Sequence, residues 1–344
     1  MKRLLVSLLM IVIVVAVSAC ATNQPATPDP TPEQADAGGT VGDETDAGVT
    51  VGDEAEADII IGVSFGQNVH PFFVAMQLGI EQAAQDLGIG NLMFLEADGS
   101  LETQVTQIED LVTMGANVIL LNPIDSDGVV NAVQHASDND VKIITIDIDC
   151  DGSDAFVASN NYLVGQMLAE YVIEALDGEG EIAMIAGIAV TSLRDRREGF
   201  MNGIAGTNIE IVAEQHAAMQ RADSLEAAET ILQAHPNIQA FVGVNENSAM
   251  GILSAVTAAG RLDDILITTV DATSENLVAI RDDLITVGVS QDPYMMGYLA
   301  VELALRMLGN EAFDAFTEVP VSYMTIDNVE EFITRERGYG VEID

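Results

Sequence analysis

The chain has 344 residues, 49% of them hydrophobic, so it can bury the cores of roughly two domains, and general disorder is excluded. Asp and Glu number 55 against 12 Lys and Arg, for a formal net charge of −43. This excludes nucleic acid as a partner, because binding a phosphate backbone requires Lys and Arg to replace condensed counterions.

The first twenty residues have the pattern of an export signal. A basic start is followed by an apolar run at 4–17 and by the small residues of VSAC, which ends at Cys20. VSAC resembles the lipobox of bacterial lipoproteins, which implies that residues 1–19 are a signal peptide and that Cys20 is acylated. An uncleaved membrane helix is the alternative, although the run is short for the ~20 residues that span a bilayer. We expect an exported protein, lipid-anchored to the outer face of the cell membrane on its periplasmic or extracellular side.

Residues 20–57 are expected to form an acidic, Pro/Gly-rich tether. Four of the nine prolines lie at 25–32, and TVGDETDAGV at 40–49 is followed by the similar TVGDEAEADI at 50–59. Such low-complexity sequence predicts a flexible linker, which would hold the domains roughly 35 Å from the anchor on average. The strong acidity suggests either a halophilic source, where salt screens self-repulsion, or simple colloidal solubility.

From residue 58 onward, short apolar runs alternate with amphipathic helical patterns. Short continuous apolar strands separated by helices indicate parallel sheets that are covered on both faces, so the predicted fold class is α/β. One run ends at Cys150, which has no intramolecular partner if Cys20 carries lipid, and we expect a half-buried, unreactive thiol there. The predicted strands lie at 59–65, 92–97, 117–123, 142–149, 155–160, 181–187, 209–215, 240–245, 265–272 and 284–291.

Polar side chains stand where many of these strands end. In open α/β sheets the ligand crevice lies beyond the carboxyl ends of the strands, next to the helix N-termini. Each such residue taken alone could instead be a helix N-cap, but their recurrence in both halves of the chain favours a binding site. The strand-end residues are Asn122, Asp147, Asn245, Asp271 and Gln291.

The order of several motifs carries a family resemblance over residues 58–325. HPFFVAM, VILLNPIDSDGVVNAV, KIITIDID, ASNNYLVGQ, AHPNIQAFVGVNE, VDAT and SQDPYMMG stand in the order and near the spacing of periplasmic-type sugar-binding proteins of the ribose-binding group. The resemblance implies two Rossmann-like domains with parallel sheets joined by three crossovers, the type I periplasmic binding fold. It places an N-terminal lobe at 58–160 plus 292–320 and a C-terminal lobe at 161–291 plus 321–344.

The same resemblance implies roles for individual residues. Phe72 and Phe73 match aromatics that pack on the C–H faces of a sugar ring, which suits the amphipathic faces of sugars. The five strand-end residues match positions that bind hydroxyl groups. Arg194 matches a pocket arginine, with Arg196 as the fallback because the segment TSLRDRREGF is one residue shorter than in the family.

Three positions depart from the ribose-binding pattern. His70 replaces an asparagine, Met219 an aromatic residue, and Ile148 an arginine. The lost arginine removes a rigid fork of donors. These departures argue against ribose itself as the ligand. We expect His70 and Met219 to line a pocket that rejects anions and prefers a small neutral sugar, a polyol or a weakly cationic ligand.

The predicted function is that of a solute-binding lipoprotein that delivers its ligand to an ABC import permease. The alternative is a sensor that presents its ligand-bound form, with a sugar or a furanosyl signal, to a membrane receptor. An enzyme is disfavoured because the sequence contains no nucleophile-elbow motif and no phosphate-binding glycine loop. The four histidines also lack the spacing of metal ligands. A repressor is disfavoured because a signal and a tether occupy the N-terminus. We expect a monomer without cofactor or metal.

Overall fold

A computed structural model describes residues 59–66, 70–187, 190–218 and 220–343. The predicted signal peptide, Cys20, the tether up to residue 57 and Met219 lie outside the described residues. Within the described ranges, no helix is both long and apolar enough to cross a membrane.

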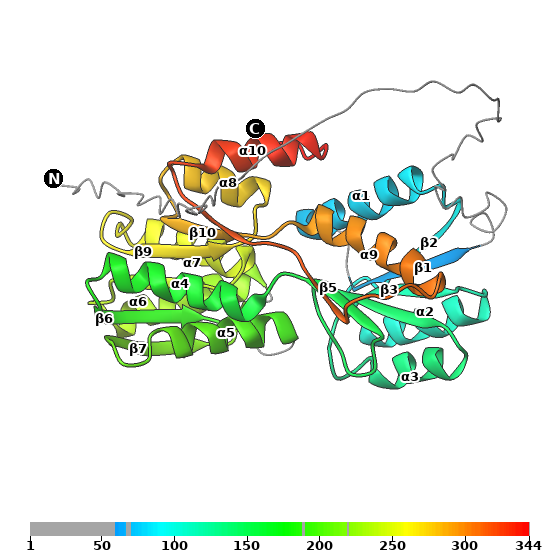
Figure 1. Cartoon of the computed structure of the whole chain (residues 1–344). Helices are drawn as coiled ribbons and strands as arrows, with labels where there is room; N and C mark the ends of the chain where they lie inside the picture. The colour runs from blue at the N-terminus through cyan, green and yellow to red at the C-terminus, as the bar shows by residue number, and fades with distance from the viewer. Residues whose placement is uncertain (1–58, 67–69, 188–189, 219, 344) are drawn as a thin grey trace, which may run out of the picture. The chain divides into compact units, whose positions relative to one another are not determined.

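The first sheet has six parallel strands in the order β11-β5-β4-β3-β1-β2 (Figure 1). Helices cover both of its faces. In β3, Val118 and Leu120 pack in one core cluster with α1 and α9, whereas Ile119 and Leu121 pack in another with α2 and α3. The two-sided covering explains why the strands are continuously apolar. The elements are β1 (Ile60–Phe65), α1 (Pro71–Asp86), β2 (Asn91–Glu96), α2 (Leu101–Thr113), β3 (Val118–Asn122), α3 (Val130–Asp138), β4 (Lys142–Ile146), β5 (Ala155–Ala158), α9 (Pro293–Leu308) and β11 (Phe316–Glu318).

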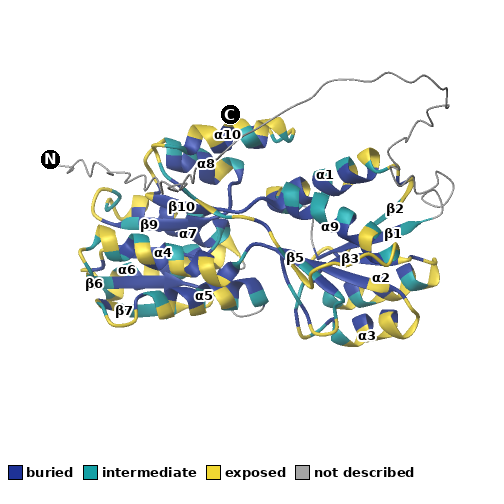
Figure 2. Cartoon of the chain, in the orientation of Figure 1, coloured by how far each residue is buried: buried dark blue, intermediate teal, exposed yellow. Residues whose placement is uncertain are grey.

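The second sheet also has six strands, in the order β12-β10-β9-β8-β6-β7, and all its pairs are parallel except β10 with β12. Its inner strands β8, β9 and β10 are buried and its edge strands β7 and β12 are partly exposed. The outer faces of the surrounding helices are exposed (Figure 2). The elements are α4 (Asn161–Ala175), β6 (Glu179–Ile185), α5 (Thr191–Gly203), β7 (Asn208–Gln215), α6 (Arg221–Ala234), β8 (Ala240–Gly243), α7 (Glu246–Ala258), β9 (Leu266–Val270), α8 (Ser274–Arg281), β10 (Val287–Ser290), β12 (Ser322–Met324) and α10 (Val329–Gly338).

The chain passes between the two sheets three times, after β5, after β10 and after β11. All ten predicted apolar runs form strands, so the predicted fold class of two parallel-sheet α/β domains is confirmed. The three-residue strands β11 and β12 were not predicted. The predicted domain boundaries at 160/161, 291/292 and 320/321 lie in the three connections, and we keep them as a proposed division of the chain.

Helices α1 and α9 approach each other closely through Gly79 of α1. A Cβ atom on Gly79 would lie 1.9 Å from the backbone oxygen of Tyr294 in α9. Gly79→Ala is therefore expected to force the helices apart and lower the free energy of unfolding by about 1–3 kcal/mol. Gly90→Ala is the matched control, because a Cβ at Gly90 meets nothing within 4 Å. Urea unfolding of both variants checks this, and equal stabilities would contradict the close approach.

Candidate ligand-binding site

Strand ends of both domains border one cavity. Its volume of about 90 Å³ is several times the 10–15 Å³ that one water molecule needs, so it suits a small molecule. Most of the residues predicted from the sequence line this cavity, together with the fallback arginine. These residues are His70, Phe72, Phe73, Asp147, Arg196, Asn245, Asp271 and Gln291.

Asp147 and Asp271 occupy equivalent places in the two domains. Asp147 follows β4 and donates its N–H to the carbonyl of Val157 in β5, while Asp271 follows β9 and donates its N–H to the carbonyl of Val289 in β10. Their φ angles are +64° and +85°, in a region that non-glycine residues seldom adopt and that is frequent at binding sites. Both backbones are thus turned out of the strand direction at the point where each carboxylate meets the cavity.

The Asp147 carboxyl group is buried. Its pKa is raised to about 7 as the net result of four effects: burial, the largest, and the charge of Asp271 raise the pKa, whereas the charge of Arg196 and the amide of Asn122 lower it. Loss of hydration disfavours the charged form of a carboxyl group, and here this effect outweighs the nearby cation. Asp147 therefore changes its charge near neutral pH.

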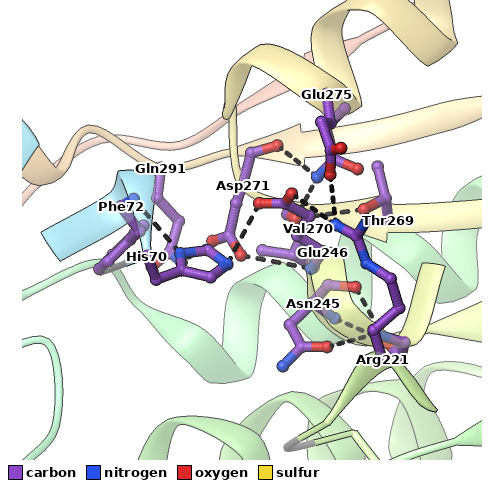
Figure 3. Close-up of polar contacts among 12 residues, drawn as sticks. His70, Phe72, Arg221, Asn245, Glu246, Thr269, Val270, Asp271, Glu275 and Gln291 are labelled. Atoms are coloured by element: carbon purple, nitrogen blue, oxygen red, sulfur yellow. Dashed lines mark hydrogen bonds and ion pairs between the residues drawn. The ribbon is translucent and has the colours of Figure 1, made fainter. Parts of the chain in front are cut away.

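A polar network surrounds Asp271 (Figure 3). Gln291 Nε2 donates to Asp271 Oδ1 at 2.6 Å, and the backbone N–H of Glu246 donates to Oδ2 at 3.4 Å. Asn276 Nδ2 donates to the Asp271 carbonyl at 3.1 Å. The carboxylate is thus held by Gln291, in the connection between β10 and α9, and by the first turn of α7.

His70 connects the network to the first domain. As the N-cap of α1, its Nδ1 accepts from the N–H of Phe72 at 3.3 Å, and its Nε2 lies 3.2 Å from Glu246 Oε2 (Figure 3). Burial lowers the pKa of His70, but the hydrogen bond and charge of Glu246, with the charge of Asp271, outweigh this, and the pKa is raised. Arg221 in turn pairs with Glu246 and Glu275. A protonated His70 therefore attracts the second domain.

Arg196, the fallback, lines the cavity, and the first choice, Arg194, does not. Arg196 is 3% exposed, and it donates from Nε to Asn161 Oδ1 at 2.7 Å and from Nη1 to the Val244 carbonyl at 2.9 Å. Arg194 is half-buried, and its Nη1 lies 3.6 Å from Asp127 Oδ2. Two residues apart on a helix means about 200° of rotation, so one of the two faces the cavity and the other faces away. The choice of Arg194 is corrected to Arg196 on this geometry.

Two of the predicted asparagines serve the backbone. Asn122 is buried beside Asp147, does not line the cavity, and donates to the Ile146 carbonyl at 2.9 Å. Asn245 lines the cavity but also forms a capping box at the start of α7, where its Oδ1 accepts from Ser248 N at 2.9 Å and its Nδ2 donates to the Ala218 carbonyl at 2.9 Å. The N-cap alternative therefore holds for Asn245, and any ligand contact of these two residues remains a prediction.

The two aromatics differ in burial. Phe72 is 6% exposed and belongs to the core of the first domain, whereas Phe73 is half-buried and packs against that core. Their rings meet edge to face with centroids 5.4 Å apart. Both border the cavity, so Phe72 combines a core position with a cavity position.

Several cavity residues were missed or only partly described by the sequence. The most important of these is Glu246, which pairs with His70 and Arg221. Its position directly after the strand-end residue Asn245 could have indicated it, but an acidic residue is common there in any case, because it interacts favourably with the N-terminal end of the helix dipole. Outside the cavity, Cys150 was expected to be half-buried and is 6% exposed, and burial raises the pKa of its thiol to about 12. The other unpredicted lining residues are Val190, Ser192, Leu193 and Asn247.

Known proteins match the part of the chain that contains all the cavity residues. The sequence model of the periplasmic binding protein domain matches residues 61–312. The ribose import binding protein of Bacillus subtilis (strain 168) is 31% identical over 267 residues, which are 77% of this chain and 86% of that protein. The D-allose-binding periplasmic protein of Escherichia coli (strain K12) is 31% identical over 247 residues, 68% of this chain and 79% of that protein. An ABC transporter solute binding protein from Bacillus halodurans C-125 with bound myo-inositol has a TM-score of 0.76 at 28% identity, covering 81% of this chain and 99% of that one.

Proposed function

Because this chain belongs to the periplasmic binding protein domain family, we propose that it captures a small sugar or polyol outside the cytoplasm and delivers it to an ABC import permease. It is a binding protein and not an enzyme. The observation that carries the choice of ligand class is the pairing of strand-end carboxylates, Asp147 and Asp271, with the half-buried ring of Phe73 in one cavity.

The chemistry of these groups suits a polyhydroxylated ring. Carboxylates accept several hydrogen bonds from hydroxyl groups, and charge-assisted bonds are the stronger kind. An aromatic face covers the C–H patches of a sugar. A thermal-shift screen with pentoses, hexoses and inositols tests the proposal, since a ligand at a hundredfold excess over its Kd adds about 2.7 kcal/mol of stability. If no sugar or polyol raises the melting temperature, the proposed function is wrong.

Ligand binding is expected to close the two domains about the connections near Asn160, Gln291 and Pro320. Hinge closure is a general property of periplasmic binding proteins, and in this chain both domains supply cavity residues. The domains also touch beside the cavity, where Asp149 N donates to Thr191 Oγ1 at 3.0 Å and Thr191 N donates to Ser126 Oγ at 3.3 Å. Small-angle scattering should show compaction on adding a ligand that calorimetry has shown to bind. An unchanged radius of gyration with bound ligand would contradict closure.

Attachment to the membrane is proposed to depend on lipid at Cys20. Cys20→Ser should abolish acylation and move the protein into the soluble fraction, because a single modification site would carry the attachment. Cys150→Ser is the matched control, since Cys150 is buried in the first domain. This substitution should leave the amount of protein in the membrane fraction unchanged. A Cys20→Ser protein that stays with membranes in high salt would indicate a retained N-terminal helix instead.

A further inference from the structure

Three buried oxygen atoms of the cavity residues have no hydrogen-bond partner among the described residues. One of them, Oε2 of Glu246, lies 3.2 Å from Nε2 of His70 in an ion pair. The other two are Oδ1 of Asp147, a residue that is 5% exposed, and Oε1 of Gln291, a residue that is 1% exposed. Both residues line the cavity. An ionised carboxylate and an amide oxygen accept hydrogen bonds and donate none, and a buried acceptor without a partner costs free energy. The site therefore calls for donors from the ligand.

Several of the protein's own donors at the cavity form hydrogen bonds within the protein. Gln291 directs its Nε2 to Asp271, and Arg196 directs Nε and Nη1 to Asn161 and the Val244 carbonyl. Directly after Asp147 stands Ile148, an apolar residue that lines the cavity and supplies no donor from its side chain.

The charges of the cavity also favour a ligand that donates hydrogen bonds. Three carboxylates, those of Asp147, Glu246 and Asp271, line it together with one arginine, Arg196, and with His70. His70 faces Glu246 at 3.2 Å, and Arg221 faces Glu246 from the other side at 3.3 Å. Glu246 is therefore compensated within the protein, and Asp147 and Asp271 are left with Arg196. A ligand with one positive charge would balance this group.

We propose that the ligand carries a protonated amine among its hydroxyl groups, as in an aminodeoxy sugar or an aminated cyclitol, and that this ammonium donates to Asp147 Oδ1. An ammonium group brings three donors and no acceptor, whereas a hydroxyl group also brings lone pairs that need donors. A neighbouring hydroxyl donates to Gln291 Oε1. The inference rests on the proposed function, because it names the ligand class of the same cavity.

The preference for an amine is expected to depend on pH. Burial raises the pKa of Asp147 to about 7, with Arg196 and Asn122 lowering it and Asp271 raising it. Below that pH Asp147 is protonated and loses its attraction for an ammonium, and above it the charge is present. Burial lowers the pKa of His70, but the hydrogen bond and charge of Glu246 and the charge of Asp271 outweigh this and raise it. The affinity ratio of an amine to its hydroxyl analogue cancels the contacts that the two ligands share.

Calorimetry on the purified protein with matched pairs tests this inference. The pairs are glucosamine with glucose, galactosamine with galactose, and an aminodeoxyinositol with myo-inositol, measured at pH 6 and pH 8. In at least one pair the amine should bind about tenfold more tightly at pH 8, since charge-assisted hydrogen bonds are roughly twice as strong as neutral ones. The ratio should fall at pH 6. It should also fall toward one in Asp147→Asn and stay high in Asp110→Asn, which removes the same charge from the exposed face of α2.

The outcomes separate this inference from the proposed function. If neutral members bind and their amines bind no better at pH 8, the amine inference is wrong and the proposed function stands. If no member of any pair binds, both are wrong. Should Asp147→Asn fail to fold, the wild-type protein still decides, because amines that bind no better than their hydroxyl analogues overturn the inference.

Discussion

Asp271→Ala is expected to weaken binding of the ligand at least about tenfold. The carboxylate lies at the cavity and is held by Gln291 Nε2 and by the N–H of Glu246. Its removal leaves the donor of Gln291 unpaired together with the ligand donors that it would accept. Each such loss costs about 1–3 kcal/mol, and more for a charged acceptor, and 1.4 kcal/mol corresponds to a factor of ten. Calorimetry with the ligand found by the screen measures the change.

Asp140→Ala provides the matched control for this substitution. Asp140 also has a positive φ, +61°, but it is exposed and does not line the cavity. Both variants place alanine at a positive φ and therefore carry a backbone penalty, so a loss of affinity in Asp271→Ala alone reports the cavity. Binding by Asp271→Ala that equals wild type would show that the strand-end carboxylate is only part of the scaffold.

The fold could be predicted from the sequence because the inner strands of both sheets are buried on both faces. Strands such as β3 and β4 appear as unbroken apolar runs, and the helices between them have apolar residues three and four apart. The strands β11 and β12 do not show this pattern. Each has three residues, and Phe316 and Glu318 of β11 are exposed, so neither has the apolar run that marks a buried strand.

Those residues of the cavity that directly follow a strand could be predicted from the sequence. Asp147 and Asp271 follow from the rule that ligands bind beyond those ends. The cavity arginine does not, because the choice between Arg194 and Arg196 depends on where α5 begins. One residue of loop length before Thr191 rotates the helix by about 100°. Glu246 was hidden for another reason, since its partners His70 and Arg221 are distant in sequence and lie on different helix termini.

The pair Phe72 and Phe73 offers a second test, with the largest expected effect on stability. Phe72 is packed in the core with Met76 and Ile80 of the same helix, whereas Phe73 is half-buried at the cavity. Deleting a buried phenylalanine ring removes its burial energy and leaves a void, and such changes typically cost 3–5 kcal/mol. Phe72→Ala should therefore lower the free energy of unfolding by about that amount without ligand.

Phe73→Ala should do the reverse and act mainly on binding. Its ring loses less buried surface in the free protein, so the effect on unfolding should be well below that of Phe72→Ala, while the ligand loses the aromatic face that covers its C–H surface. Denaturant unfolding without ligand and calorimetry with ligand, applied to both variants, separate the two roles. Each variant controls for the other, because the same atoms are removed from adjacent positions of α1. If Phe73→Ala destabilises the free protein as much as Phe72→Ala and leaves affinity unchanged, then both rings are core and the aromatic wall of the proposed site is wrong.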